Sequence, residues 1–168
     1  EKHGKAASVA VFTDGLTASG RMTNNDYKVL TANGWEVISH SVNHQSLMRM
    51  NNEQVQYELE TSKDILTSLG FKVRGFVAPY SSYPRVFKMH LCNNYDYAFS
   101  GYVDSRTQPP SAFAQTLTNR WFLVRANMQY MSLEKMKQFV DYAHEKGLYL
   151  VFYEHKIANT DGHISAAK

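Results

Sequence analysis

Two histidines, His40 and His44, are separated by three residues and directly follow a run of strand-forming residues, WEVIS. Neutral imidazole is a good ligand for Zn²⁺. Two imidazoles at this spacing reach one ion if the segment forms a helical turn, because residues i and i+4 share a helix face. A third ligand and a water molecule would complete a tetrahedral site. Two solvated loop histidines would show the same pattern, so H-x-x-x-H alone is a weak indication of metal binding.

Two other candidates also follow strand-like runs. Pro79 and Tyr80 come after GFVA, where the proline restricts the backbone and the N–H of Tyr80 could donate to an oxyanion. His155 follows LYLVFYE. Its ordinary pKa of about 6.5 would let it act as a general acid near neutral pH. The alternatives are a strand that simply ends in a turn and a histidine with a purely structural role.

An α/β fold would position these residues. Short apolar runs alternate with amphipathic stretches, which favours a mainly parallel sheet. In such folds ligands bind at the carboxyl ends of the strands, where all three candidate groups lie. The expected strands are residues 7–12, 35–39, 73–78, 95–99, 121–125 and 148–153.

Helices are expected between these strands. Asn24 or Asn25 would cap the first, which Gly34 would end, and the longest would span residues 52–69 before Gly70.

Two shorter helices and a long loop complete the prediction. Pro84 would open a helix through Leu91, because proline suits a first helical turn. Ser132 would cap another, which Gly147 would end. The inward-facing residues of this last helix would be Leu133, Met136, Phe139, Val140 and Ala143. A long loop is expected over residues 100–119.

Composition excludes several classes of protein. The 168 residues fit one domain, and 43% hydrophobic and 20% charged residues are ordinary for a globular protein. The net charge of +3 comes from well-mixed charges, which argues against nucleic-acid binding. No apolar run approaches the ~20 residues needed to cross a bilayer. Cys92 is the one cysteine, so an internal disulfide and a multi-cysteine zinc site are excluded.

Taken in order, strand–HSxxH, strand–PY and a late strand ending near a histidine resemble the polysaccharide deacetylase family, also called NodB-homology or carbohydrate esterase family 4. The segments that carry the resemblance are KHGKAASVAVF, NGWEVISHSVNHQSL, GFVAPYSSYPRV and KGLYLVFYEHKI. The resemblance covers nearly the whole chain. It implies a distorted or incomplete (β/α) barrel that binds an extended sugar chain in a surface groove.

The resemblance also implies a reaction. A metal-dependent hydrolase would remove N-acetyl groups from a polysaccharide containing N-acetylglucosamine, with metal-bound water as nucleophile. His40 and His44 would hold the metal, usually zinc, with cobalt or nickel as alternatives. The Tyr80 N–H would help hold the oxyanion, and His155 would protonate the departing amine. Pro79, Tyr80 and Arg125 would bind the substrate. Family members commonly act on the cell wall, so a secreted, cell-surface or phage-particle location is expected.

The chain departs from the family pattern in its acids. The family's two aspartates come from a Thr-Phe-Asp-Asp type motif on a first strand, but only 39 residues precede His40. Asp14 is a single acid whose preceding residues resemble the second strand, so it is expected to be a loop residue. The domain is therefore predicted to be truncated at both ends and to lack the strand with the acid pair. Val77 replaces the usual arginine before Pro79, with Arg120 and Arg125 as candidate replacements.

These departures leave a second function open. A catalytically inactive carbohydrate-binding module would keep the groove without the acids. Tyr80, Tyr83 and Tyr102 would then stack on sugar rings, unless they belong to the core.

Overall fold

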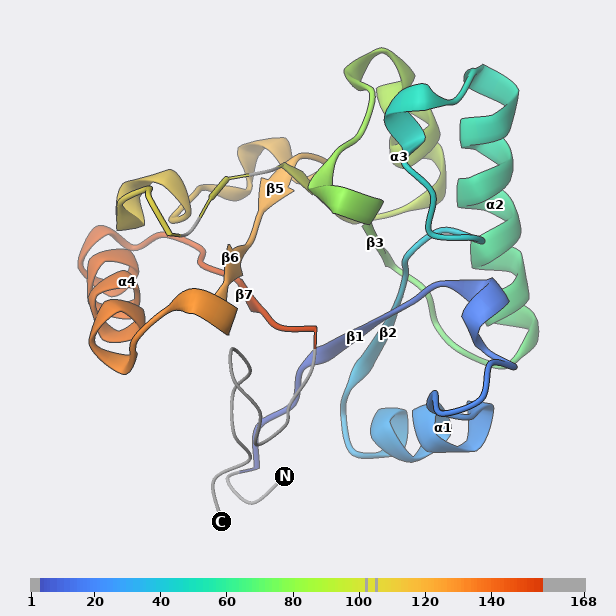
Figure 1. Cartoon of the computed structure of the whole chain (residues 1–168), viewed down its shortest axis with the longest axis horizontal. Coiled ribbons are helices and arrows are strands. Elements are labelled where there is room, and N and C mark those ends of the chain that lie inside the picture. Colours follow the sequence, from blue (N-terminus) through green and yellow to red (C-terminus); the bar gives the residue numbers. More distant parts are fainter. Residues whose placement is uncertain (1–3, 102, 105, 156–168) are drawn as a thin grey trace. The chain divides into compact units, whose positions relative to one another are not determined.

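A computed structural model describes residues 4–101, 103–104 and 106–155 (Figure 1). Contacts within the chain define two compact units. Unit 1 contains the described residues up to Ser100 together with Arg120–Phe122. Unit 2 contains the described residues of Gly101–Asn119 and those from Leu123 onward.

Unit 1 is built on a parallel sheet. Its strands are β1 (Ser8–Val11), β2 (Glu36–Ser39), β3 (Gly75–Val77) and β4 (Tyr97–Gly101). They are ordered along the sheet as they are along the chain, and each pairs in parallel with the next. The predicted α/β class with parallel strands is confirmed, although each strand is shorter than expected or shifted in its bounds. Because all four strands run the same way, their carboxyl ends meet at one edge of the sheet.

Three helices of unit 1 connect these strands: α1 (Asn24–Ala32), α2 (Asn52–Ser68) and α3 (Lys88–Asn94). Thr23 caps α1 in a capping box with Asp26, so the prediction that Asn24 or Asn25 is the cap was wrong. The helix expected to open at Pro84 also starts later. Pro84 precedes a single 3₁₀ turn, Arg85–Phe87, which leads into α3.

The core of unit 1 lies between the sheet and α2. Val55, Leu59 and Leu66 are fully buried on the helix and pack with strand residues such as Val37 and Phe76. The buried stripe of α2 also includes two polar residues, Glu58 and Ser62. Their spacing from the apolar residues places them on the same helix face.

Buried hydroxyl groups tie α2 to the sheet. The Oγ atoms of Ser39, at the end of β2, and Ser62 are 2.7 Å apart. The Tyr95 hydroxyl donates to the Leu59 carbonyl at 2.7 Å, and burial raises the pKa of Tyr95 to about 12. These bonds fix where α2 lies along β2, because buried polar groups must keep their partners.

Unit 2 contains β5 (Leu123–Val124), β6 (Ala126–Asn127), β7 (Phe152–Tyr153) and α4 (Leu133–Lys146). β6 and β7 pair in parallel. Their surroundings form a separate core around Phe113, Ala126, Met131 and Phe139. As predicted, Ser132 caps α4 and Gly147 ends it in the left-handed conformation.

Two predictions for unit 2 were wrong. Leu133 and Val140 are exposed, while Phe139 and Ala143 are buried. Leu133 and Val140 are seven residues apart, so they share one stripe of the helix, which lies beside the stripe that faces the core. The strand expected over residues 148–153 is also reduced to β7, because Tyr149 instead forms an antiparallel bridge with Gln115.

The strand expected over residues 121–125 is likewise reduced, to β5 at Leu123–Val124. The Arg120 carbonyl accepts from Ala98 N–H at 2.7 Å, and the Trp121 carbonyl accepts from Ser100 Oγ at 2.8 Å.

In the described part of the chain the strands do not close into a complete barrel, in agreement with the predicted incomplete barrel. None of the described helices combines the length and apolar character that crossing a bilayer requires.

Candidate functional site

The histidine pair lies at the carboxyl edge of the sheet of unit 1. His40 immediately follows β2, and its N–H donates to the Val11 carbonyl at 2.8 Å, which extends the pairing with β1 by one residue. The residues that follow β1 and β3 border the same edge. Three segments therefore meet there, each just after a parallel strand: residues 12–15, 40–44 and 79–81.

The segment between the histidines is not the helical turn that the sequence suggested. Ser41 and His44 have φ values of 71° and 60°, in the left-handed region, and no helix is assigned to residues 40–44. The imidazole rings nevertheless come together, with centroids 4.6 Å apart and planes at 82°. A tight non-helical loop thus brings about the ring contact that a helical turn was expected to produce.

The tautomer of His40 follows from its hydrogen bond. Nδ1 lies 2.7 Å from the backbone carbonyl oxygen of Val77, at the end of β3. A carbonyl oxygen only accepts, so Nδ1 carries the proton and donates. The lone pair of neutral His40 is then on Nε2. This carbonyl support of one imidazole nitrogen is the usual arrangement around metal-binding histidines.

His44 is surrounded by aromatic rings. Besides His40, the ring centroids of Phe12 and Tyr80 lie 5.5 Å and 5.2 Å from that of His44, both in edge geometry. Phe12 is itself fixed in place. The guanidinium of Arg21 lies 4.5 Å from the Phe12 centroid, and a Cβ added to Gly15 would approach Phe12 Cζ to 2.6 Å.

Backbone hydrogen bonds hold the histidine loop from the side of β1. The N–H groups of Thr13 and Asp14 donate to the carbonyls of Ser41 and Val42 at 3.2 and 2.9 Å. Within the loop, the N–H of His44 donates to Ser41 Oγ at 3.1 Å.

The opposite side of the loop is held by a residue that the sequence analysis missed. Glu58 of α2 is only 2% exposed, and its Oε2 accepts from the N–H groups of Val42 and Asn43 at 2.8 and 3.3 Å. The signal in the sequence was a glutamate three residues after Val55 and four before Ser62, a spacing that places it on the buried face of α2.

Backbone strain gathers at this edge. Among the described residues, the non-glycine residues with positive φ are Ser41, His44, Tyr80 and Ser81. Each costs on the order of 1–3 kcal/mol and persists only where the surrounding structure holds it. All four lie in the two segments that border the histidine rings.

Pro79 and Tyr80 form a tight turn after β3. Pro79 is buried, whereas the Tyr80 side chain is 64% exposed. The hydrogen bonds of the turn run from the N–H groups of Ser81 and Ser82 to Ala78 and Pro79. The N–H of Tyr80 precedes the N–H groups that make these two bonds.

The two imidazoles fit a divalent metal ion as two of its ligands. Their rings are in contact, and the lone pair of His40 lies on the nitrogen opposite its carbonyl partner. Asp14 is in the 3₁₀ turn Thr13–Gly15 and is exposed. In the described part of the chain, no group of three His, Cys, Asp or Glu side chains is arranged to hold a metal. The described part of unit 1 therefore offers two imidazoles, and no third side chain, to a metal ion.

The remaining predicted site residues belong to unit 2. His155 follows β7 and is exposed, with its ring centroid 5.4 Å from that of Tyr153 and its N–H donating to Glu154 Oε1 at 2.7 Å. Arg125 lies between β5 and β6, with its guanidinium 4.4 Å from the Tyr153 centroid. Burial lowers the pKa of Arg125 to about 10, so it stays cationic at neutral pH.

The remaining candidates, two tyrosines and an arginine, differ in where they lie. Tyr83 is 5% exposed and packs in the core of unit 1, so of its two alternatives the core position is confirmed and stacking on sugar is excluded. Tyr102 lies outside the described residues. The guanidinium of Arg120 lies 4.6 Å from the ring of Trp121.

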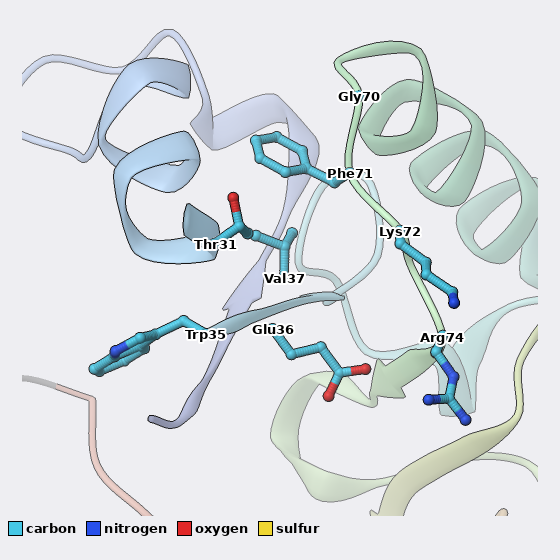
Figure 2. A pocket seen from close by; sticks show the side chains of 8 residues that line it. All are labelled: Thr31, Trp35, Glu36, Val37, Gly70, Phe71, Lys72 and Arg74. Atoms are coloured by element: carbon cyan, nitrogen blue, oxygen red, sulfur yellow. The ribbon is translucent and has the colours of Figure 1, made fainter. Parts of the chain in front are cut away.

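A pocket of unit 1 is at the opposite end of β2 from His40 (Figure 2). Trp35 and Glu36, at the start of β2, line it together with Lys72 and Arg74, which precede β3. Figure 2 shows the Trp35 indole extending away from the cavity. This pocket is at the amino-terminal edge of the strands, so it is separate from the histidine pair.

Comparison with protein-family models finds one match, described as polysaccharide deacetylase, over residues 5–98. This range contains His40, His44 and Tyr80. None of the curated proteins compared with the chain matches it.

Three solved structures show the similarity of the fold. The deacetylase PplD from Streptococcus pyogenes is 20% identical, with a TM-score of 0.70 over 82% of this chain and 60% of that protein. A polysaccharide deacetylase from Bacillus cereus is 17% identical, with a TM-score of 0.64 over 80% and 42%. A CE4 family pseudoenzyme from Bacillus anthracis is 14% identical, with a TM-score of 0.55 over 90% and 55%. The chain thus spans less than two thirds of each of these proteins.

Proposed function

The chain belongs to the polysaccharide deacetylase family, and from this premise we propose that it takes part in the metal-dependent removal of N-acetyl groups from a polysaccharide containing N-acetylglucosamine. The observation that supports this proposal is the contact between His40 and His44 at the carboxyl edge of the sheet. The hydrogen bond from His40 Nδ1 to Val77 places the lone pair of the neutral imidazole on Nε2, the nitrogen that would bind the metal.

In this proposal His40 and His44 hold a divalent metal ion, zinc or alternatively cobalt or nickel. The metal, when bound, supplies Lewis-acid activation of the acetyl carbonyl. A carboxylate ligand from outside the described residues would complete the set, as the family resemblance implies. The rings of Phe12 and Tyr80 against His44 limit its rotation, which fixes the direction of its nitrogen atoms.

Tyr80 and Pro79 form the substrate-binding part of the proposal. The N–H of Tyr80 would donate to the carbonyl oxygen of the acetyl group as negative charge develops on it. The exposed ring of Tyr80 would offer a face to a sugar ring. Pro79 is buried and fixes the turn that presents both groups.

His155 is proposed as the general acid. Water adds its oxygen to the acetyl carbon and releases its protons to solvent as acetate forms, the C–N bond breaks, and the amine nitrogen takes a proton from the imidazolium of His155, which solvent then reprotonates. The products are acetate and a free amino sugar, so the atoms balance. Arg125, cationic at neutral pH, would bind the polar substituents of the sugar chain. Such a polymer would place the protein at or outside the cell surface.

A second candidate is a catalytically inactive carbohydrate-binding module. It is favoured by one observation, which is that no third metal ligand joins the histidine pair among the described residues. One structural neighbour is itself a pseudoenzyme of the same family. In this case the protein would bind the sugar chain without cleaving the amide.

Acetate release decides between these functions. The protein is incubated with N-acetylglucosamine oligosaccharides in the presence of Zn²⁺ or Co²⁺, after removal of endogenous metal with a chelator. Metal-dependent acetate release that His40→Ala abolishes supports the deacetylase. Oligosaccharide binding by calorimetry without acetate release supports the inactive module, and full activity of His40→Ala would exclude the proposed metal site.

A further inference from the structure

The buried stripe of α2 presents a carboxylate to the histidine loop. Glu58 is 2% exposed and has backbone partners on a different element, since Oε2 accepts from Val42 N–H at 2.8 Å and Asn43 N–H at 3.3 Å. No ion pair of Glu58 is found among the described residues. The two amides are therefore the contacts that account for a carboxylate at this core position.

These amides belong to Val42 and Asn43. The residues on either side of them, Ser41 and His44, have positive φ. The N–H groups of Val42 and Asn43 donate to α2, where Oε2 of Glu58 accepts from both. Buried N–H groups require an acceptor. Glu58 supplies one oxygen to both, so it holds the part of the loop that determines where the His44 ring lies.

The position of Glu58 is itself fixed. Ser62 is one turn further along α2, and its hydroxyl lies 2.7 Å from that of Ser39 on β2. The same hydroxyl donates to the Glu58 carbonyl. α2 is thus anchored to β2, the strand that precedes the histidine loop. Glu58 on α2 therefore has a fixed position relative to that loop.

From this geometry we infer that Glu58 is a positioning residue of the histidine site. It acts through the Val42 and Asn43 amides to keep His40 and His44 in contact. The property that matters is a side chain long enough to place an acceptor oxygen at both amides. The inference that this affects metal binding rests on the proposed function, whereas the effect on the loop does not.

Three substitutions separate reach from charge. Glu58→Gln keeps the length and an acceptor oxygen but removes the charge. Glu58→Asp keeps the charge but is one methylene too short to reach both amides, and Glu58→Ala removes both. Glu60 provides the matched control, because it lies on the same helix and its carboxylate accepts from the Gln56 side chain at 3.0 Å, away from the loop.

Two measurements are made on the whole chain. Amide hydrogen exchange of Val42 and Asn43 is measured without metal, and Co²⁺ affinity is measured by visible absorption of the bound ion. We expect Glu58→Gln to retain amide protection and affinity close to wild type. Glu58→Asp and Glu58→Ala lose the protection, and their Co²⁺ affinity falls roughly 10–100-fold, as for other groups that orient metal ligands. Glu60→Gln and Glu60→Asp change neither quantity.

Several results would overturn the inference. Unchanged exchange in Glu58→Asp and Glu58→Ala would remove the positioning role, and a loss confined to Glu58→Gln would show that charge is what matters. If Glu58→Ala does not fold, the comparison of Gln with Asp decides. Loss of the fold in all three would make Glu58 a general structural residue. If wild type binds no Co²⁺ through His40, the proposed function fails, while amide exchange still tests Glu58.

Discussion

The histidine pair of unit 1 and His155 of unit 2 both follow parallel strands, yet their surroundings differ. His40 is bonded to the end of β3, and the loop that leads to His44 is held by residues from β1 and α2. His155 is exposed, follows a strand of two residues, and contacts Tyr153 within its own segment. A metal ligand set must be placed to within a fraction of an ångström, whereas a proton donor needs reach and a suitable pKa. The buried contacts are found around the histidine pair, which is the proposed metal site.

Backbone strain follows the same division. All described non-glycine residues with positive φ border the histidine pair, and none of them is in unit 2. Strained loops persist when packing and hydrogen bonds determine them fully. The comparison therefore indicates a preorganised histidine pair in unit 1 and simpler surroundings for His155, the proposed proton donor, and each prediction below tests that contrast.

The largest effect is expected for His40→Ala. Removing one of two imidazoles should abolish detectable Co²⁺ binding, a larger loss than the roughly 10–100-fold typical of groups that only orient ligands. Titration followed by visible absorption measures it. His90→Ala is the control, because His90 lies on α3 and pairs with Asn52 instead. Equal Co²⁺ affinity in both variants would remove His40 from the metal site.

His155→Ala should affect turnover alone. Loss of a general acid typically lowers the rate about 10²–10⁴-fold, and the exposed side chain makes few contacts to lose. Acetate release should therefore fall by that factor while Co²⁺ affinity and the free energy of unfolding stay at wild-type values. A variant that loses metal affinity as much as turnover would show that the two regions are not independent.

Gly15→Ala tests the ring packing around His44. The added Cβ would come within 2.6 Å of Phe12, so the ring must move and its contact with His44 must change. Overpacking of this kind costs about 1–3 kcal/mol of stability, and we expect Co²⁺ affinity to fall as well. Urea unfolding and Co²⁺ titration measure the two effects.

Gly75→Ala is the matched control for this substitution. Its Cβ would clash with the Tyr97 ring, at the amino-terminal end of β3 and away from the histidines. A similar loss of stability is expected without loss of metal affinity. If both variants lose affinity equally, the effect reflects general destabilisation and the role of Phe12 is wrong.

The smallest effect concerns Tyr95, whose pKa is raised by burial to about 12. Below pH 10 the tyrosine is neutral in both states. Between about pH 10 and 12 it ionises in the unfolded chain while staying neutral in the folded one, so stability falls as pH rises, by at most about 1.4 kcal/mol per pH unit. Urea unfolding from pH 9 to 11 measures the slope.

Tyr95→Phe should flatten this alkaline loss. It should also cost about 1 kcal/mol near neutral pH, because the hydrogen bond to the Leu59 carbonyl is removed. Burial also raises the pKa of Tyr83, so part of the alkaline loss should remain in the variant. An unchanged slope would show that Tyr95 does not contribute to it.

Much of the fold could be predicted because its signals are local. The extent of α2, the Ser132 cap and the Gly147 stop of α4 each depend on neighbouring residues along the chain. One prediction failed although its signal was local, since Thr23 and not Asn24 or Asn25 caps α1, and others failed where distant contacts decided the outcome. Tyr83 is aromatic and follows a strand, which suits an exposed site as well as a core, and only packing against Phe76 and Phe122 made it core.

For the site, the sequence by itself determined which groups follow parallel strands, and therefore that His40, His44 and Tyr80 would meet at one edge. It did not determine how the histidine rings face each other. That depends on left-handed backbone at Ser41 and His44, a conformation that local preferences disfavour and that no periodicity signals. Only the tertiary structure provides its cause, since Glu58, Thr13 and Asp14 reach the loop from other elements and their hydrogen bonds offset the local strain.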